Sequence, residues 1–406
     1  MTARVLLVLG LGALYAQYSA FTSPALHDAV SKLVNARTSS DNDGFLLRTI
    51  HTGNKSLDRL LAYLVVLRWP LCLSDGSDAA LTASTIAYAG LTSAVWTLLL
   101  LEGYRCGNKG RVIAFPTNFA LLGQFLPVAF VTCIYGAIQH LWTSNTNSNP
   151  SKQDVKIPRA VLTVLPIVTL FGFTAPTAVS IVPMSSDLVP WAVAVFLAWP
   201  VLASIAIFLI DAVSSWGKTV NAGAPGFVDP SVGGTALKDV RYAGLLRIIY
   251  GLSFVVAAFT YVVCALLPLV DSFAPGLIPS NLAILKSQSL WSPYITGASG
   301  AIYYALAIDY NLSSVGILIW VGSLYSQVRT TGSMSYLKLG SLVLFAGPVA
   351  AAVWMVWERD CVVLGFSKNS GLSVSFSDEK GKTRPRGGSG MGIGKWERGG
   401  KVLVLP

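Results

Sequence analysis

The stretch AIYYALAIDYNLSSVGILIWV, residues 301–321, decides the fold of this chain. It is apolar over a length that can cross a bilayer, since a spanning helix needs about 20 residues. It also contains one acid, Asp309. A carboxyl group in hydrocarbon is costly, so we expect Asp309 to face the interior of a helix bundle or a cavity. The stretch therefore predicts a membrane helix that carries a functional group.

The composition supports the same interpretation for the whole chain. Of its residues, 53% are hydrophobic and 12% are charged, and the mean hydropathy is +0.61. A soluble domain carries about 25% charged residues, so the soluble class is excluded. The formal net charge of +10 comes from bases in loops and in the segment after Arg359. That distribution is typical of a cytoplasmic tail and does not indicate a nucleic-acid-binding surface.

The chain shows no sequence pattern for a metal or a nucleotide. His27, His51 and His140 form no paired-ligand motif, and the five cysteines have no CxxC spacing. No phosphate-binding glycine loop follows an expected strand. We therefore expect no metal site and no nucleotide cofactor.

Run lengths divide the chain into four parts. Residues 1–22 are either a cleaved signal peptide or a first spanning helix, and the uncleaved helix is the favoured alternative. Residues 23–78 are a polar loop with an amphipathic interfacial helix at 57–73, because Arg59 and Arg68 make that segment too charged to span easily. Residues 79–357 form the transmembrane bundle, and residues 358–406 form a basic disordered tail.

Apolar runs predict an all-α membrane bundle of about eight transmembrane helices. After the first segment, spans are expected near residues 79–101, 113–142, 160–183, 188–213, 243–270, 300–326 and 337–357. With the basic tail in the cytoplasm, eight spans place Asn54, in the glycosylation sequon Asn54-Lys55-Ser56, in the lumen. They also place the basic segment 143–159 in the lumen, against the positive-inside tendency. The sequence leaves the orientation open.

Three acids at or within apolar runs are the candidate catalytic residues: Asp309, Glu102 and Asp211. Asp309 is flanked by aromatic residues, and it either donates a proton or caps a helix that begins at Tyr310. Glu102 ends the run LTSAVWTLLLLE, and it either pairs with Arg105 at the interface or faces a cavity in protonated form. Asp211 ends the run VLASIAIFLID and is better explained as the end of a span.

Aromatic side chains near these acids are candidate substrate contacts. Their faces stabilise cations, and tyrosine hydroxyls can hydrogen-bond to a carboxyl group. A tryptophan in the run that ends at Glu102 can share a helix face with that acid, and four more aromatics lie on the run that holds Asp309. The candidate substrate-binding residues are Trp96, Tyr303, Tyr304, Tyr310 and Trp320.

Three stretches give the chain a resemblance to a known family: RTIHTGNKSLDRLLAYLVVLRWPL (48–71), SAVWTLLLLEGYRCGNKG (93–110) and AIDYNLSSVGILIWVGSLY (307–325). With the overall layout of residues 45–357, they resemble the fungal membrane-bound terpene cyclases of ascochlorin and ascofuranone biosynthesis. The resemblance implies a cyclase of meroterpenoid biosynthesis, a multi-pass protein of the endoplasmic reticulum. It implies that the substrate is a farnesyl chain, epoxidised at its end, on an aromatic polyketide.

Such chemistry implies a general acid that protonates the epoxide or an alkene, and a carbocation that then cyclises. It implies neither a metal nor a nucleotide. The partners are then a prenylated aromatic polyketide and the lipid bilayer. Two other functions fit the same residues: a small-metabolite transporter, in which the acids relay protons, and a polytopic scaffold without catalytic activity.

Overall fold

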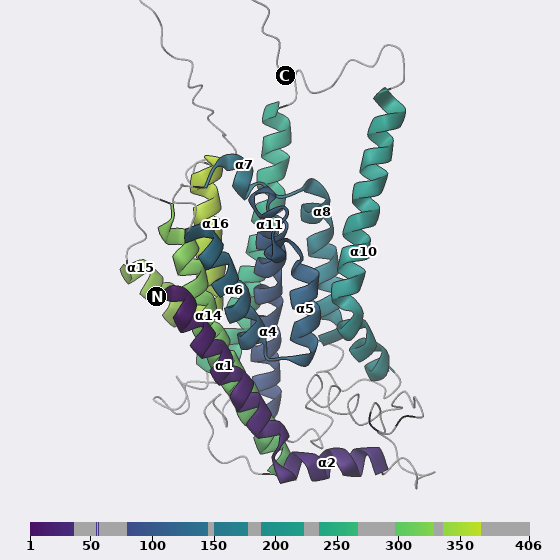
Figure 1. Ribbon diagram of the computed structural model, residues 1–406, viewed down its shortest axis with the longest axis vertical. Helices are drawn as coiled ribbons and strands as arrows, with labels where there is room; N and C mark the ends of the chain where they lie inside the picture. Colours follow the sequence, from purple (N-terminus) through teal and green to yellow (C-terminus); the bar gives the residue numbers. More distant parts are fainter. Residues whose placement is uncertain are drawn as a thin grey trace, which may run out of the picture. The chain divides into compact units, whose positions relative to one another are not determined.

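The computed structural model is a bundle of α-helices (Figure 1). It describes residues 1–35, 54, 56, 79–144, 150–177, 188–222, 235–266, 297–328 and 336–366, and these residues contain no β-strand. The interfacial helix expected at 57–73 and the tail from residue 367 onward lie outside the described residues. The all-α prediction is confirmed for the part of the chain that is described.

The helices fall into long and short elements. The long ones are α1 (Thr2–Phe21), α4 (Ala79–Gly103), α6 (Val128–Ser144), α8 (Arg159–Val168) with its π-helical continuation η5 (Thr169–Thr174), α10 (Leu188–Ala222), α11 (Thr235–Tyr261) with η6 (Val262–Leu266), α14 (Gly297–Ser326) and α16 (Pro348–Leu364). The shorter ones are α2 (Pro24–Asn35), η3 (Cys106–Asn108), η4 (Val112–Ala114), α5 (Pro116–Phe125), α7 (Lys152–Val155) and α15 (Tyr336–Ala346).

The helices α4 and α14 form the centre of the bundle. α14 packs against α1, α4, α6 and α16, and α11 packs against α4 and α16. α8 packs against α10 and α11, and α10 also packs against α5. α4 is buried on all its faces, as Leu91, Leu98, Leu99 and Leu101 show. A helix that is hydrophobic all round is expected at such a central position.

Five segments are long and apolar enough to cross a membrane: Thr2–Ala20, Ala83–Gly103, Lys152–Thr177, Arg241–Leu266 and Gly300–Ser326. Shorter apolar stretches lie where the sequence predicts three further spans: Val195–Ile210 within the helix α10, and the helices Val128–Thr143 and Tyr336–Ala346. Large apolar side chains such as Phe208, Leu252 and Phe259 are exposed on the outer surface. A surface of this kind suits contact with lipid. In the described residues, five of the eight expected spans therefore have the length and composition of a membrane span, and the helix α10 also runs through the whole of a sixth, 188–213.

Two expected spans, 113–142 and 337–357, are each broken into two helices. In the first, α5 is followed by Leu126 in an extended conformation (φ −112°, ψ 160°) and by Pro127. The residue before a proline avoids the helical conformation, which explains the break. In the second, Gly347 has a φ of 89°, and Pro348 begins α16. The length of the apolar run therefore predicted one continuous helix in each case, where the structure has two shorter helices.

The structure also moves two boundaries expected from the sequence. Part of the segment expected as a polar loop is the helix α2. α16 continues past position 358, where the tail was expected to begin, and ends at Leu364. It is followed by Gly365 with φ 78°, and a glycine in this left-handed conformation commonly ends a helix. Arg359 and Asp360 therefore belong to the folded bundle and not to the tail.

The α5–α6 hairpin (Pro116–Ser144) contains two glycines that make room for tryptophan rings. A Cβ atom on Gly136 would lie 2.7 Å from Cγ of Trp320, a fully buried side chain on α14. A Cβ atom on Gly123 would overlap the ring of Trp96. The close packing of α6 on α14 therefore requires glycine, which has no side chain, at position 136.

We expect Gly136→Ala to lower the free energy of unfolding by about 1–3 kcal/mol, the usual cost of overpacking a closed core. On α14, an added Cβ atom at Gly322 would meet no atom within 4 Å, so Gly322→Ala is the matched control. The control should be neutral or slightly stabilising, because alanine favours helix. The temperature of half-unfolding in detergent measures both variants. Equal temperatures for the two would contradict the close contact.

Candidate functional site

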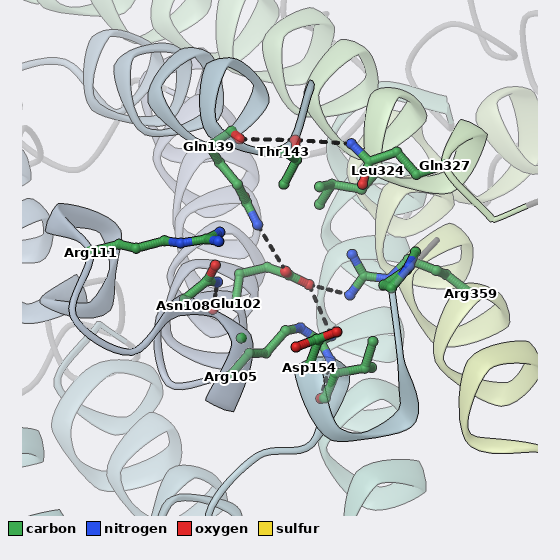
Figure 2. A pocket seen from close by; sticks show the side chains of 13 residues that line it. Glu102, Arg105, Asn108, Arg111, Gln139, Thr143, Asp154, Leu324, Gln327 and Arg359 are labelled. Atoms are coloured by element: carbon green, nitrogen blue, oxygen red, sulfur yellow. Dashed lines mark hydrogen bonds and ion pairs between the residues drawn. The ribbon is translucent and has the colours of Figure 1, made fainter. Parts of the chain in front are cut away.

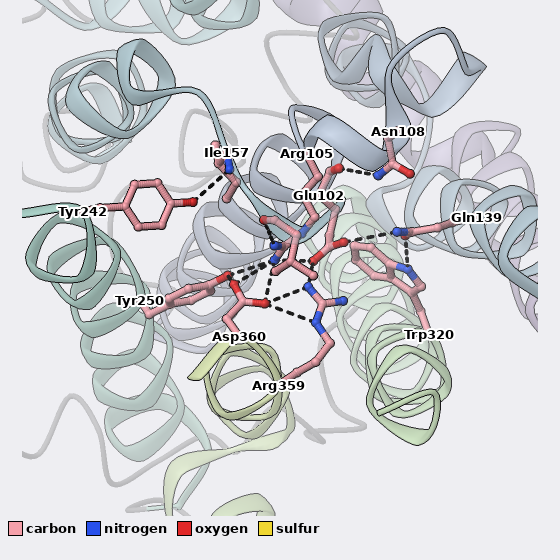
Figure 3. A network of polar contacts seen from close by, with 11 residues as sticks. Glu102, Arg105, Asn108, Gln139, Ile157, Tyr242, Tyr250, Trp320, Arg359 and Asp360 are labelled. Atoms are coloured by element: carbon pink, nitrogen blue, oxygen red, sulfur yellow. Dashed lines mark hydrogen bonds and ion pairs between the residues drawn. The ribbon is translucent and has the colours of Figure 1, made fainter. Parts of the chain in front are cut away.

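Four charged side chains form a buried ion cluster where the C-terminal ends of α4 and α16 meet (Figure 3). The cluster consists of Glu102 and Arg105, at and just after the end of α4, and of Arg359 and Asp360 near the end of α16. Each of the four residues is at most 5% exposed. Charged side chains are rarely buried unless they are paired, so the contacts within the cluster are decisive.

Each carboxylate of the cluster contacts both guanidinium groups. Arg105 Nη2 lies 2.9 Å from Glu102 Oε1 and 2.9 Å from Asp360 Oδ2. Arg359 Nη2 lies 3.0 Å from Asp360 Oδ1 and also donates to Glu102 Oε1. Two positive and two negative charges thus balance, and burial of ions is tolerated when such pairing is complete. Burial alone would lower the pKa of Arg105, but Asp360 and Glu102 outweigh it and raise that pKa above its ordinary value.

Uncharged groups add further hydrogen bonds to the cluster. Tyr250 of α11 donates to Asp360 Oδ2 at 2.7 Å. Asn108 donates to the backbone oxygen of Glu102 at 2.6 Å, and Arg105 Nη1 donates to the carbonyl oxygen that ends α7. The cluster therefore ties α4, α7, α11 and α16 together.

The carboxylate of Glu102 has one further partner, the side-chain amide of Gln139 on α6. Gln139 Nε2 donates to Glu102 Oε2 at 3.2 Å, and Gln139 Oε1 accepts from Trp320 Nε1 at 2.8 Å. An indole nitrogen is only a donor, so the amide oxygen must face it. Trp320 therefore directs the amide nitrogen of Gln139 toward Glu102.

The ion cluster borders a cavity of about 250 Å³ (Figure 2). Glu102, Arg105 and Arg359 are part of its wall, whereas Asp360 is not. Most of the remaining wall is polar, and it consists of Gly107, Asn108, Arg111, Gln139, Thr143, Pro150, Asp154, Val155, Leu324 and Gln327. Glu102 is the buried carboxylate that the described residues present to this cavity.

Asp309 belongs to a second, separate polar cluster in the middle of α14. Its carboxylate accepts hydrogen bonds from the backbone amides of Val128 at 3.0 Å and Ala129 at 2.7 Å, and from the hydroxyl of Tyr88 at 2.6 Å. Amides in the first turn of a helix have no partner within that helix. Asp309 therefore caps α6 from a neighbouring helix. Because α14 continues through position 309, the alternative that Asp309 caps a helix beginning at Tyr310 is wrong.

The two acids Glu102 and Asp309 do not share a site. Tyr88, the partner of Asp309, and Glu102 lie 14 positions apart on α4. At a rise of about 1.5 Å per residue, they are about 21 Å apart along the helix axis. Of the two acids, Glu102 is in the wall of the described cavity and Asp309 is not.

Of the five aromatic candidates, one lies on the outer surface and four are buried. Tyr304 is 62% exposed, and the buried ones are Trp96, Tyr303, Tyr310 and Trp320. None of the five belongs to the wall of the described cavity. Trp320 is linked to it through Gln139. A direct contact of these residues with a substrate stays a prediction.

Two other candidates have no described contact with the cavity. Asp211 lies within α10, and its side chain is outside the described residues. Asn54 is exposed, and its Oδ1 accepts a hydrogen bond of 3.0 Å from the backbone amide of Ser56. Catalysis by Asp211 and glycosylation of Asn54 both stay predictions.

Sequence reasoning missed Arg359, Asp360 and Gln139 as members of the site. It placed the first two in the tail, and it passed over Gln139 because 37 positions separate that residue from Glu102. A signal was available in the run Glu358-Arg359-Asp360, which sets a base between two acids directly after an apolar segment. Mixed charge at such a place indicates ion pairing more than a basic tail.

The chain matches known sequences over most of its length. The family model of the CtvD domain matches residues 2–364, from the start of α1 to the end of α16. "Terpene cyclase ascI" of Acremonium egyptiacum is 26% identical over 337 residues, which cover 79% of this chain and 81% of that protein. "Terpene cyclase ctvD" of Aspergillus terreus is 26% identical over 321 residues, 75% of this chain and 83% of that protein. "Terpene cyclase penA" of Penicillium crustosum is 22% identical over 368 residues, 87% and 94% of the two chains. No solved structure matches the chain.

We expect Asp309→Ala to destabilise the bundle. Loss of a capping side chain costs about 0.5–2 kcal/mol, and here it removes the acceptor of two buried backbone amides. Asp309→Asn keeps one acceptor oxygen, so its temperature of half-unfolding in detergent should lie between those of Asp309→Ala and the parent. An unchanged temperature for Asp309→Ala would show that the cap contributes nothing.

Proposed function

Because the chain belongs to the CtvD domain family, which contains fungal terpene cyclases, we propose that it is a membrane-bound terpene cyclase. Its substrate is a farnesyl chain, epoxidised at its end, on an aromatic polyketide, and its product is a cyclised isomer in meroterpenoid biosynthesis. The single observation that supports the choice of site is the buried carboxylate of Glu102 in the wall of the cavity.

Cyclisation of such a chain is an isomerisation, so the proton given to the substrate is returned. Protonation of the epoxide oxygen breaks one C–O bond and leaves a carbocation, which adds to a double bond or is trapped by a hydroxyl group. Loss of a proton from the cyclised cation ends the reaction. One carboxyl group can serve both steps, first as a general acid and then as a general base.

The ion cluster supports this double role for Glu102. In this structure its carboxylate is paired with Arg105 and Arg359, and a carboxylate is the form that accepts the proton at the end of the reaction. To act as the acid, Glu102 first takes up a proton from water at the polar cavity, which weakens its attraction to the two guanidinium groups. Transfer of that proton to the epoxide oxygen restores the attraction, and the proton lost from the cyclised cation returns to Glu102 or to water. Asp360, which is outside the cavity wall, keeps both guanidinium groups in place.

Three other residues take supporting roles in this proposal: Gln139, which the sequence did not single out, and the candidates Trp320 and Asp309. Gln139 positions the carboxyl group of Glu102, and Trp320 positions Gln139. Asp309 shapes the bundle by capping α6. None of these roles requires contact with the substrate.

The apolar helices support a location in a membrane. The described bundle contains five segments of spanning length, and large apolar side chains are exposed on its outer surface. A prenyl chain is itself soluble in hydrocarbon, so a substrate of this class reaches the protein through the bilayer. We propose a multi-pass protein of the endoplasmic reticulum membrane.

We expect Glu102→Gln to lower the rate of cyclisation by about 10²–10⁴-fold, because an amide cannot exchange the proton and general acid–base catalysis contributes about this factor. Microsomes that contain the protein receive a farnesylated phenol epoxide, and formation of an isomer of unchanged mass is measured. A parental rate in Glu102→Gln would exclude this role for Glu102. No isomer with the parent protein would favour the transporter or the scaffold.

A control separates the loss of catalysis from the loss of fold. Removal of one partner from a buried ion pair is itself destabilising. Glu102→Asp keeps the charge on a shorter side chain, so it should fold like the parent and retain part of its rate. The amount of each variant in the membrane and its temperature of half-unfolding are measured beside the rate.

Independence from metal ions is part of the same proposal. Within the described ranges, His, Cys, Asp and Glu side chains form no group of three or more that could hold a metal ion. We expect the parent protein to cyclise its substrate at an unchanged rate in EDTA. A loss of activity in the chelator that added magnesium restores would contradict this expectation.

A further inference from the structure

The α5–α6 hairpin enters the bundle and returns to the same end (Figure 1). α5 holds 10 residues, which make about 15 Å of helix, half of a hydrocarbon thickness of about 30 Å. After Pro127, α6 leads back. Arg111, which precedes α5, lies over the ring of Trp142, near the end of α6, with 5.6 Å between guanidinium carbon and ring centroid. The hairpin is therefore re-entrant and adds no crossing of the membrane.

Several segments consequently meet at one end of the bundle, which we call the cavity end. The backbone amide of Cys106, after α4, donates to the carbonyl oxygen of Lys156, after α7, at 2.9 Å. Gln327, just after α14, donates to a hydroxyl of α6 at 3.0 Å. Asp360 of α16 pairs with Arg105 at 2.9 Å. The ends of α4, α6, α14 and α16 and the loops beside them therefore lie on one side of the membrane.

The helix α1 identifies the opposite end, because it runs antiparallel to α14. Gly10 lies beside Cys133, which also contacts Gly316, whereas Gly12 lies beside Leu312. As the residue numbers increase along α1, those of the neighbouring residues on α14 decrease, so the two helices are antiparallel. The C-terminal end of α1 and the helix α2 that follows it lie away from the cavity end, as Figure 1 also shows.

The residues that the structure describes at the two ends differ in charge. At the cavity end, segments 104–115 and 150–159 contain a single exposed acid, Asp154, and five exposed or half-exposed bases: Lys109, Arg111, Lys152, Lys156 and Arg159. At the opposite end, the charged residues within the described ranges are Asp28 and Lys32 of α2. Short loops rich in lysine and arginine remain in the cytoplasm, and acids contribute little to this bias.

We propose that the cavity end faces the cytoplasm and that the cavity opens at the cytoplasmic surface of the membrane. The sequence alone predicted a crossing at 113–142, which placed the basic segment 143–159 in the lumen, against the positive-inside tendency. Because the hairpin is re-entrant, the basic segments before and after it lie on the same side of the membrane, and this conflict disappears. The orientation does not depend on the proposed function. If that function also holds, the substrate reaches Glu102 from the cytoplasmic leaflet, and the oxidising reaction that supplies the epoxide must deliver it to that leaflet.

Cys106 is a natural reporter of this orientation, because it is exposed at the cavity end while Cys133, Cys264 and Cys361 are buried. The full chain with Cys72→Ser is expressed in sealed microsomes, whose outer face is the cytoplasmic one. A membrane-impermeant maleimide is added before or after detergent. We expect equal labelling under both conditions and loss of the signal in Cys106→Ser.

Two further variants make the result decisive. Thr22→Cys, exposed at the opposite end, should be labelled only after detergent in a chain that lacks Cys106. Lys109→Cys is a second exposed reporter at the cavity end and should behave like Cys106. The proposal is overturned if Cys106 and Lys109→Cys both need detergent or both stay unlabelled, or if Thr22→Cys is labelled without it. Labelling needs no catalytic activity, so failure of the orientation and failure of the proposed function are distinguishable.

Discussion

The pairing of four buried charges is the constraint on which the rest of the bundle depends. Glu102 and Arg105 lie at and just after the end of α4, and Arg359 and Asp360 lie near the end of α16, which is distant in sequence. If one partner moved away, an uncompensated charge would remain in the interior, at a cost of about 3–5 kcal/mol. The ends of α4 and α16 are therefore fixed against each other. The same contacts hold the carboxylate of Glu102 in the cavity wall, so the fold and the proposed site rest on one interaction.

Local properties of the sequence predicted a large part of this fold. Apolar run length located α4, α11 and α14, because a spanning helix requires little more than composition. The pairing of Glu102 with Arg105, left as one of two alternatives, is confirmed at 2.9 Å, since residues three apart are neighbours at a helix end. The partner Arg359 stands 257 positions from Glu102. A single sequence contains no period or motif that marks a contact of this kind.

The case of Asp309 shows why burial alone does not reveal a role. The sequence predicted that this acid faces the interior, and in the structure it is 9% exposed. A buried acid implies that some partner compensates it, without naming that partner. Here the partners are two amides of α6, which need an acceptor because Pro127 interrupts the apolar segment. The same proline divides the expected span 113–142 into α5 and α6. The break in that span and the capping role of Asp309 therefore have one cause.

The cap on α6 also constrains how the chain is assembled in the membrane. Asp309 follows Ala129 by 180 positions, so it leaves the ribosome long after the hairpin that it completes. Until then the tip of the hairpin would expose backbone amides to hydrocarbon, which offers them no acceptor. The hairpin must wait at the membrane surface or inside the insertion machinery until α14 arrives. The site is therefore completed only when the C-terminal half of the chain has been synthesised. A nascent chain released before α14 lacks the acceptor that α6 needs in order to pack in the bundle.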